Sequence, residues 1–246
     1  MFYSIKIDNQ MITASIWDEA QMDLSDRESY TINYKGENLD GDCIIAHSTA
    51  SFVLFSAIVD HHNPIGFFIV KSSVIMNTLE YANGGPLRGN SVRSFLCPVY
   101  KLENQYLILI ESDCPKPNDF IEMIISILNP KNIVIFFSES TTFPPTINSS
   151  KSNLQDNQSR CHAFPSDDTF FNLPFHFSGL PAGILIFCPI HSINYKLLFI
   201  ENESSYESAF SVIISEMQKL INIDSNTVIE RAITIMNERK AIEKMI

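Results

Sequence analysis

The residues between Pro117 and Ser138 constrain the fold more than any other stretch of the chain. They begin with "PNDFIEMIISILNP", in which Ile121, Ile125 and Leu128 share one face of a short amphipathic helix. "KNIVIFFS" follows at once, and an apolar run without polar interruption is typical of a strand inside a sheet that is covered on both faces. A helix that leads into such a strand belongs to the unit that builds parallel sheets. The sequence therefore predicts an α/β fold.

A second strand and helix are predicted earlier in the chain. In "GDCIIAHSTASFVLFSAIVDHH" a short apolar run precedes Ser48 and Thr49, which are candidate helix N-caps, and a mainly apolar helix then extends to Val59. "GFFIVK" indicates another buried strand, and a helix that continues past Pro64 is the alternative for it. These elements add a strand, a helix and a further strand to the expected fold.

Two adjacent strands are predicted at 93–112, "RSFLCPVYKLENQYLILIES", where "KLENQ" separates two apolar runs in the pattern of a hairpin. Pro98 lies inside the first run, which indicates an edge strand or a bulge because proline cannot donate a ladder hydrogen bond. The glycines of "MNTLEYANGGPLRGNSV" predict a loop before this hairpin.

Residues 177–204 have the sequence "FSGLPAGILIFCPIHSINYKLLFIENES". Pro181 is predicted at the first position of a buried helix, Pro189 is predicted to end that helix, and a central strand is expected at 195–202. The apolar run from Ala182 to Cys188 is too short to span a bilayer, which needs about 20 residues. No membrane span is therefore expected here.

Two helices are predicted to close the chain. The first begins after an N-cap at Ser204 or Ser205 and carries an apolar face that extends to Ile221. The second occupies about 226–246, with Arg239 and Lys240 late in the helix, where positive charge complements the helix dipole.

The whole chain, 1–246, is expected to form a single domain, since 246 residues suffice for one sizeable core. Residues 139–168 are rich in Ser, Thr, Asn, Pro and Asp without any sustained period, which predicts a long flexible loop within that domain.

Charge and cysteine content limit the classes of partner and compartment. The formal net charge is −11, and the 17 lysines and arginines form no run, which excludes a ligand with a phosphate backbone such as nucleic acid. The five cysteines are odd in number and widely spaced, as in proteins with reduced thiols. The first residues lack a basic stretch followed by an apolar one, so no signal peptide is expected. We expect a cytoplasmic protein, with the nucleus as a second location.

Asp60, His61 and His62 form the most chemically suggestive cluster, because neighbouring Asp and His can bind divalent metals and an Asp-His-His run occurs in a family of metal-dependent phosphoesterases. That family needs further ligands on neighbouring strand ends, and the sequence shows no second acidic cluster in such a context. Consecutive histidines at a helix end also point in different directions. A solvated helix end is the favoured interpretation.

Three weaker motifs also receive structural interpretations. Cys188 and His191 have half of a zinc spacing without a second pair, and Cys161-His162 falls in the predicted loop. The loop 84–89, "GGPLRG", lacks the Lys-Ser/Thr ending of a P-loop, which leaves a plain turn, with an anion site at Arg88 and Arg93 as the alternative. No G-x-S-x-G nucleophile motif is present.

The order of these elements resembles that of a known family. The segments "IIAHSTASFVLFSAIVD", "SFLCPVYKLENQYLILIES", "NIVIFFSES" and above all "LPFHFSGLPAGILIFCPIHSINYKLLFIENES" are similar to the proteasome assembly chaperone 1 family, the first subunit of a heterodimer that helps to build the α-ring of the 20S core particle. The resemblance extends from Asp42 to about Leu220, and the Leu180-Pro181-Ala182 helix start is its most specific part.

This resemblance implies an α/β three-layer sandwich in which helices flank a mostly parallel or mixed central sheet, similar to the nucleoside-phosphorylase architecture. It implies no catalytic activity and no cofactor. The implied partners are proteasome assembly chaperone 2, in a heterodimer, and the proteasome α subunits. The low charge and the 18 phenylalanines suit a protein whose apolar surface is covered by a partner.

The family also docks through a C-terminal tripeptide of a hydrophobic residue, tyrosine and any residue, which inserts into pockets between α subunits. The corresponding residues here are Lys244, Met245 and Ile246, so Met245 stands at the tyrosine position and Lys244 at the hydrophobic one. This departure leaves tail docking as a hypothesis. The alternative function is an enzyme for a nucleoside or phosphoester on a related fold, using Arg88, Asp60 and His61.

Overall fold

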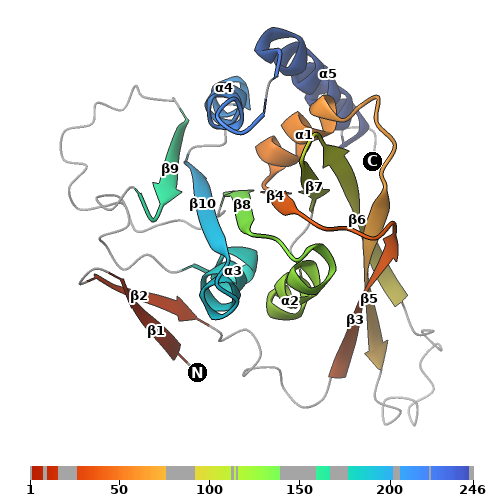
Figure 1. The fold of residues 1–246 in the computed structure, drawn as a ribbon. Helices are drawn as coiled ribbons and strands as arrows, with labels where there is room; N and C mark the ends of the chain where they lie inside the picture. Colours follow the sequence, from red (N-terminus) through yellow and green to blue (C-terminus); the bar gives the residue numbers. More distant parts are fainter. Residues whose placement is uncertain are drawn as a thin grey trace, which may run out of the picture.

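The computed structural model describes residues 2–7, 10–15, 27–75, 92–111, 114, 116–138, 159–166, 177–201, 206–221 and 223–243. Eight of the described strands form one sheet in the order β3-β5-β6-β7-β4-β8-β10-β9 (Figure 1). Their bounds are β3 Arg27–Gly36, β4 Asp42–His47, β5 Gly66–Ile75, β6 Val92–Leu102, β7 Gln105–Leu109, β8 Asn132–Phe137, β9 Arg160–Phe164 and β10 Asn194–Glu201. A separate antiparallel pair is formed by β1 (Phe2–Ile7) and β2 (Gln10–Ser15).

The centre of the sheet is parallel and both of its flanks are antiparallel. β4 pairs in parallel with β7 and with β8, and β8 pairs in parallel with β10. β3, β5, β6 and β7 pair antiparallel in turn on one side, and β9 pairs antiparallel with β10 on the other. The predicted strand "KNIVIFFS" is confirmed as β8, which lies between β4 and β10 with every residue of 133–137 buried.

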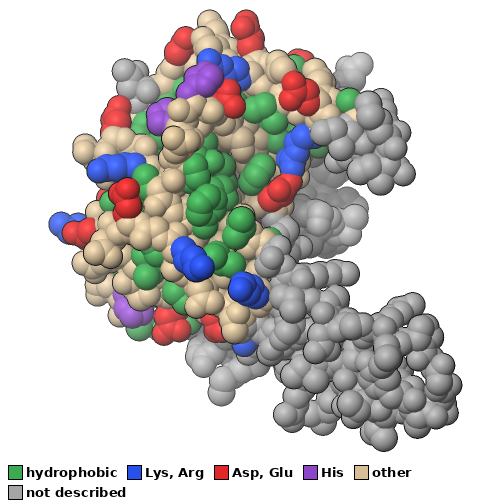
Figure 2. Space-filling model, turned by 90° about the vertical axis from the view of Figure 1, so that its right-hand side faces the viewer, with side chains coloured by type: hydrophobic (Ala, Val, Ile, Leu, Met, Phe, Trp, Pro, Cys, Tyr) green, Lys and Arg blue, Asp and Glu red, His purple; other side chains and the backbone are tan. Residues whose placement is uncertain are grey.

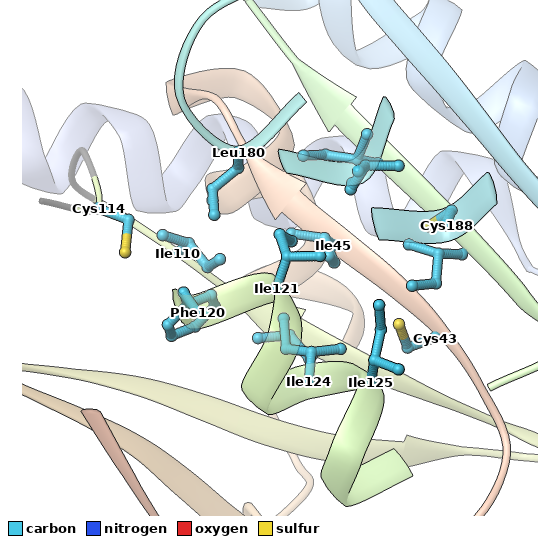
Figure 3. Packing of buried hydrophobic residues seen from close by; sticks show 14 of the residues in the cluster. Cys43, Ile45, Ile110, Cys114, Phe120, Ile121, Ile124, Ile125, Leu180 and Cys188 are labelled. Carbon is cyan, nitrogen blue, oxygen red and sulfur yellow. The ribbon is translucent and has the colours of Figure 1, made fainter. Parts of the chain in front are cut away.

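Helices cover both faces of this sheet, which confirms the three-layer α/β sandwich with a mixed sheet. α2 (Pro117–Leu128) and α3 (Gly179–Ile190) pack on one face. α1 (Thr49–Ile58), α4 (Tyr206–Met217) and α5 (Ser225–Glu243) pack on the other. In the first of these layers Ile121 and Ile125 of α2 lie beside Ile45 and Cys43 of β4 (Figure 3).

The helix ends follow the signals in the sequence. Ser48 caps α1 in a capping box with Ser51, since the Ser48 hydroxyl accepts the Ser51 backbone N–H and the Ser51 hydroxyl accepts that of Ser48. α2 begins at Pro117 and ends before Asn129, which adopts the left-handed conformation (φ 45°) that asparagine tolerates.

The predicted bounds of α3 and α4 need correction. α3 begins at Gly179, so Pro181 is the third helical residue, where the missing N–H costs nothing because the first turn has no internal acceptor. The same helix continues through Pro189 to Ile190, since a proline so near the end disrupts only the last turn. α4 ends at Met217, and the following residues form a turn, so Ile221 lies outside the helix.

Part of the predicted loop 139–168 is wrong, because residues 160–164 form β9. Their polar composition concealed an edge strand, which is held by backbone pairing with β10 and by the buried side chain of Phe164. The segments 139–158 and 167–168 lie outside the described residues.

Pro98 also departs from its prediction, because β6 is an interior strand between β5 and β7. The β6–β7 register ends at Val99 opposite Ile108, so Pro98 lies one residue beyond that pairing and needs no partner there. The hairpin itself is confirmed.

β3 was not predicted from the sequence, and an aromatic ring on a glycine fixes its position. A Cβ atom at Gly66 of β5 would lie 2.2 Å from the Tyr34 hydroxyl oxygen, so the ring occupies space that only glycine leaves free. Tyr34 also contacts Phe68 with ring centroids 5.0 Å apart. This packing holds β3 on β5 at the edge of the sheet.

Candidate protein-binding face

One part of the sheet is apolar on both of its sides, although helices cover only one of them there. On β5 and β6, Phe68, Val70, Cys97 and Val99 point into the core beneath α2 and are buried. The alternate residues Phe67, Ile69, Leu96 and Pro98 therefore point to the opposite side. We call these four residues the outer apolar face.

The pairing register brings the four side chains together. Phe67 is opposite Pro98, and Ile69 is opposite Leu96, so the two pairs are neighbours along the same side of two adjacent strands. Leu96 is 58% exposed, and the other three are partly exposed. Hydrophobic side chains gather in the middle of this side of the molecule (Figure 2).

The outer apolar face lies on the side of the sheet that α1, α4 and α5 cover, but on the parts of β5 and β6 that these helices do not reach. Tyr100 and Leu102 of β6 point to the same side and do contact that layer. Within the described part of the chain, no helix covers β5 and β6 farther along, and Leu96 is the most exposed residue of the four. Exposed apolar patches of this kind mark interaction sites.

The end of α5 borders the outer apolar face. Arg239 forms an ion pair with Glu111, which follows β7, and its guanidinium lies 5.3 Å from the centroid of the Phe52 ring on α1. The β6–β7 register ends at Val99 opposite Ile108, and Leu96 and Glu111 each lie three residues beyond that pair. α5 belongs to the helix layer on the side of the sheet toward which the outer apolar face points.

Asp60, His61 and His62 lie in an exposed turn after α1. The His61 Nδ1 is 3.9 Å from the Asp60 Oδ2, and both side chains are more than half exposed. α1 begins at the carboxyl end of β4, and ten residues at about 1.5 Å each carry the chain to the other end of the sheet. Sites in α/β folds lie at the carboxyl ends of parallel strands, so this cluster is at the opposite edge.

The cysteine-histidine motifs do not assemble into a site. Cys188 is buried in α3, whereas His191 caps the helix and is exposed. Cys161 and His162 lie in β9 rather than in a loop, and being adjacent in a strand they point to opposite sides. Among the described residues, no group of three or more His, Cys, Asp or Glu could hold a metal ion.

Burial determines the thiol chemistry. Burial raises the pKa of Cys97 and of Cys188 to about 12, and it raises the pKa of Cys43 further still, with smaller contributions from nearby groups. A thiol whose pKa is raised in this way stays protonated and is a poor nucleophile and metal ligand. All five cysteines lie within the described residues and are thiols rather than disulfides.

The carboxyl ends of the parallel strands, where an α/β enzyme would place its site, carry two contacts between described titratable side chains, and one of these is the ion pair of Glu111, after β7, with Arg239. In the other, His162 Nε2 is 3.1 Å from Glu201 Oε2 at the end of β10. The corresponding ends of β4 and β8 carry His47 and Ser138.

Several predicted residues lie outside the described residues. These are the loop 84–89 with Arg88, and the tail residues Lys244, Met245 and Ile246. Arg93 lies in β6, and its side chain is not described. Tail docking and the anion site therefore stay predictions. No described helix is both long and apolar enough to cross a bilayer.

The outer apolar face is the feature that the sequence reading missed. The signal was present in "GFFIVK" and "SFLCPVY", where neighbouring residues are apolar on both sides of each strand. The first run predicts a buried strand and the second predicts one strand of a hairpin, and only the arrangement of the helices shows that they share one open side.

No model of a known protein family matches the sequence, and no curated protein matches it. Solved structures do resemble it. PbaA of Pyrococcus furiosus, described as an archaeal homolog of proteasome-assembly chaperone, is 11% identical, with 87% of this chain and 97% of PbaA covered and a TM-score of 0.53. At this identity the likeness shows a shared fold.

Two further structures are similar over comparable lengths. A protein of unknown function from Thermoplasma acidophilum is 16% identical, with 85% of this chain and 88% of that one covered and a TM-score of 0.49. Another protein of unknown function, from Corynebacterium glutamicum, is 12% identical, with 87% and 89% covered and a TM-score of 0.45.

Proposed function

We propose that this chain is a non-catalytic chaperone that promotes assembly of the 20S proteasome α-ring, as a heterodimer with proteasome assembly chaperone 2. The observation that carries the proposal is the outer apolar face. Four apolar side chains on two adjacent strands, one of them 58% exposed, give a surface that is more stable when another protein covers it. A catalytic role gives no account of such a surface.

The fold that this chain shares with PbaA supports the same proposal, because PbaA is described as a homolog of proteasome-assembly chaperone. Since one fold serves many functions, this likeness adds to the outer apolar face and does not replace it. We place the chain in the cytoplasm, with the nucleus as a second location, where proteasome α subunits would be its clients.

The tail residues Lys244, Met245 and Ile246 are proposed as a second contact with the ring. They follow the last turn of α5, which borders the outer apolar face. A client that covers this face would therefore have the tail within reach. The lysine and methionine in place of a hydrophobic residue and tyrosine predict a weaker contact than a full motif would make.

Co-expression tests the proposal directly. The chain is produced alone, with proteasome assembly chaperone 2 of its source organism, and with the α subunits, and each sample is analysed by size-exclusion chromatography with light scattering. We expect a one-to-one complex of the two chaperones that increases the yield of α-rings. A well-behaved monomer that joins neither the chaperone nor the α subunits would contradict the proposal.

The enzyme alternative has a separate test. A nucleoside or a divalent cation that raises the melting temperature of the wild-type chain, with the effect lost in His61→Ala, would favour it. The exposure of Asp60 and His61 and their place at the opposite edge of the sheet do not favour it.

A further inference from the structure

The charge around the outer apolar face has the opposite sign to that of the whole chain. The chain has 28 acidic and 17 basic residues, for a net charge of −11. Among the outward positions of β3, β5 and β6 whose side chains the structure describes, the charged ones are Lys35 and Lys71, and the neighbouring Glu111 after β7 is paired with Arg239. The other described outward positions of these three strands carry apolar or uncharged side chains.

The register places both lysines next to the apolar centre. Lys35 is opposite Phe67 on one side of the patch, and Lys71 follows Ile69 on the same side of β5. Both are exposed, and neither makes an ion pair within the part of the chain that the structure describes. Two ammonium groups without an ion pair among the described residues thus border an apolar patch.

We infer that the outer apolar face binds a different protein, through a surface that has an apolar centre and carboxylates placed opposite Lys35 and Lys71. This inference rests on the proposed function, since it specifies the partner that a chaperone of this kind would contact. Apolar contact supplies the attraction, and opposite charges at the rim fix the register and the choice of partner.

A second copy of the chain fits this surface poorly. Two identical outer faces would bring lysines together, and Glu111, the carboxylate that follows β7 on the same side, is already paired with Arg239. Like charges across an interface disfavour association, so the chain should prefer a partner of another sequence.

Site-specific photo-crosslinking tests the inference. Benzoylphenylalanine replaces Leu96 in the full-length chain, and a matched chain carries it at Leu220, a leucine that is 38% exposed after α4. Each purified chain is irradiated in an extract of the source cells, and the adducts and their crosslinked peptides are identified by mass spectrometry. We expect one dominant adduct at position 96 with another protein, at a peptide that contains Asp or Glu.

Charge reversal supplies the second readout. The change Lys35→Glu with Lys71→Glu should lower the yield of the position-96 adduct on the order of tenfold, which corresponds to about 1.4 kcal/mol. The matched pair Lys101→Glu with Lys131→Glu changes the net charge equally, at exposed lysines away from the outer apolar face, and should leave the yield unchanged. Circular dichroism confirms that each variant is folded.

The outcomes separate the inference from the proposed function. An adduct of two copies, equal yields at positions 96 and 220, no adduct, or indifference to Lys35→Glu with Lys71→Glu would each overturn the inference. A charge-dependent adduct at position 96 with a protein unrelated to the proteasome would keep the inference and overturn the proposed function. Binding of proteasome proteins that crosslink only at position 220 would keep the proposed function and overturn the inference.

Discussion

Asp42 and Asn132 are joined by two hydrogen bonds across the amino ends of β4 and β8. The Asp42 Oδ1 accepts the Asn132 backbone N–H at 2.8 Å, and its Oδ2 accepts the Asn132 side-chain amide at 2.7 Å. The backbone N–H of Lys131 also donates to Asp42 Oδ1, and the Asn132 amide oxygen accepts the side chain of Asn194 on β10. One carboxylate thus ties together the starts of three parallel strands.

Asp42→Ala should lower the free energy of unfolding by about 1–3 kcal/mol, because it leaves backbone and side-chain donors at the strand ends without their acceptor. Urea unfolding followed by circular dichroism measures this. The exposed Asp60→Ala is the control and should change stability by no more than about 0.5 kcal/mol. Equal effects of the two changes would show that the bonds to Asp42 contribute nothing measurable.

Leu107 and Leu96 should respond very differently to the same truncation. Leu107 of β7 is fully buried, so Leu107→Ala should cost about 2–5 kcal/mol through lost burial and a residual cavity. Leu96 is mostly exposed in the isolated chain, and Leu96→Ala should stay within about 0.5 kcal/mol. Chemical denaturation of both variants measures the contrast, and a large loss for Leu96→Ala would mean that the outer apolar face is covered within the chain itself.

A thiol reagent at pH 8 should modify one cysteine quickly. Cys161 is partly exposed, whereas the other four are buried, and burial raises the pKa of Cys97 and Cys188 to about 12. A raised pKa keeps these thiols protonated at pH 8, so they lack the reactive thiolate. Absorbance of the released chromophore should show one fast thiol in the native protein and five in guanidinium chloride. Loss of the fast phase in Cys161→Ser identifies it, and several fast thiols would contradict the burial.

Glu216 should make the stability of the protein depend on acid. Burial raises the pKa of Glu216, but hydrogen bonds and charges from Lys219 and Lys196 outweigh burial, so the pKa lies below its usual range. A carboxyl with a lowered pKa in the folded state contributes stability above its unfolded pKa of about 4.3, and this is lost as pH falls through the folded value. Glu216→Gln should therefore be less stable than the wild type at pH 7, and the difference should shrink toward pH 3 in thermal unfolding. Glu230→Gln, at an exposed position of α5, is the control and should change stability at pH 7 by no more than about 0.5 kcal/mol.

Arg239→Ala should loosen the last turns of α5. The change removes the ion pair with Glu111 and the contact with the Phe52 ring. Lys240, which lies 4.9 Å from the centroid of the Tyr206 ring, remains as the other cationic contact. Hydrogen exchange should become faster in the peptide that ends α5 and remain unchanged in α2. Glu238→Ala, an exposed neighbour, is the control, and equal exchange in the two variants would contradict the anchoring role of Arg239.

The sequence predicted the central elements of the fold because their signals are local. The capping serine of α1, the spacing of apolar residues in α2 and the uninterrupted run of β8 each specify an element without reference to the rest of the chain. β3 and β9 were missed because edge strands carry mixed residues and owe their structure to pairing with a neighbour.

The candidate site was hidden for a related reason. A run such as "GFFIVK" reads the same whether a helix or another protein covers its second side. The hydrogen bonds that link Asp42 through Asn132 to Asn194 connect residues more than 150 positions apart in the sequence. A periodic pattern of apolar residues cannot predict a contact over such a separation. The outer apolar face became recognisable only from the positions of α1, α4 and α5, which leave that side of β5 and β6 open among the described residues.

The position of Arg239 makes the end of α5 a natural reporter. A fluorescent dye attached through Ala241→Cys, in a chain whose Cys161 is replaced by serine, would sit two residues beyond Arg239 and alter none of the residues of the outer apolar face. Whatever docks there would change the surroundings of the dye. The fluorescence of the dye thus measures whether a partner occupies the outer apolar face, and binding can be followed in real time.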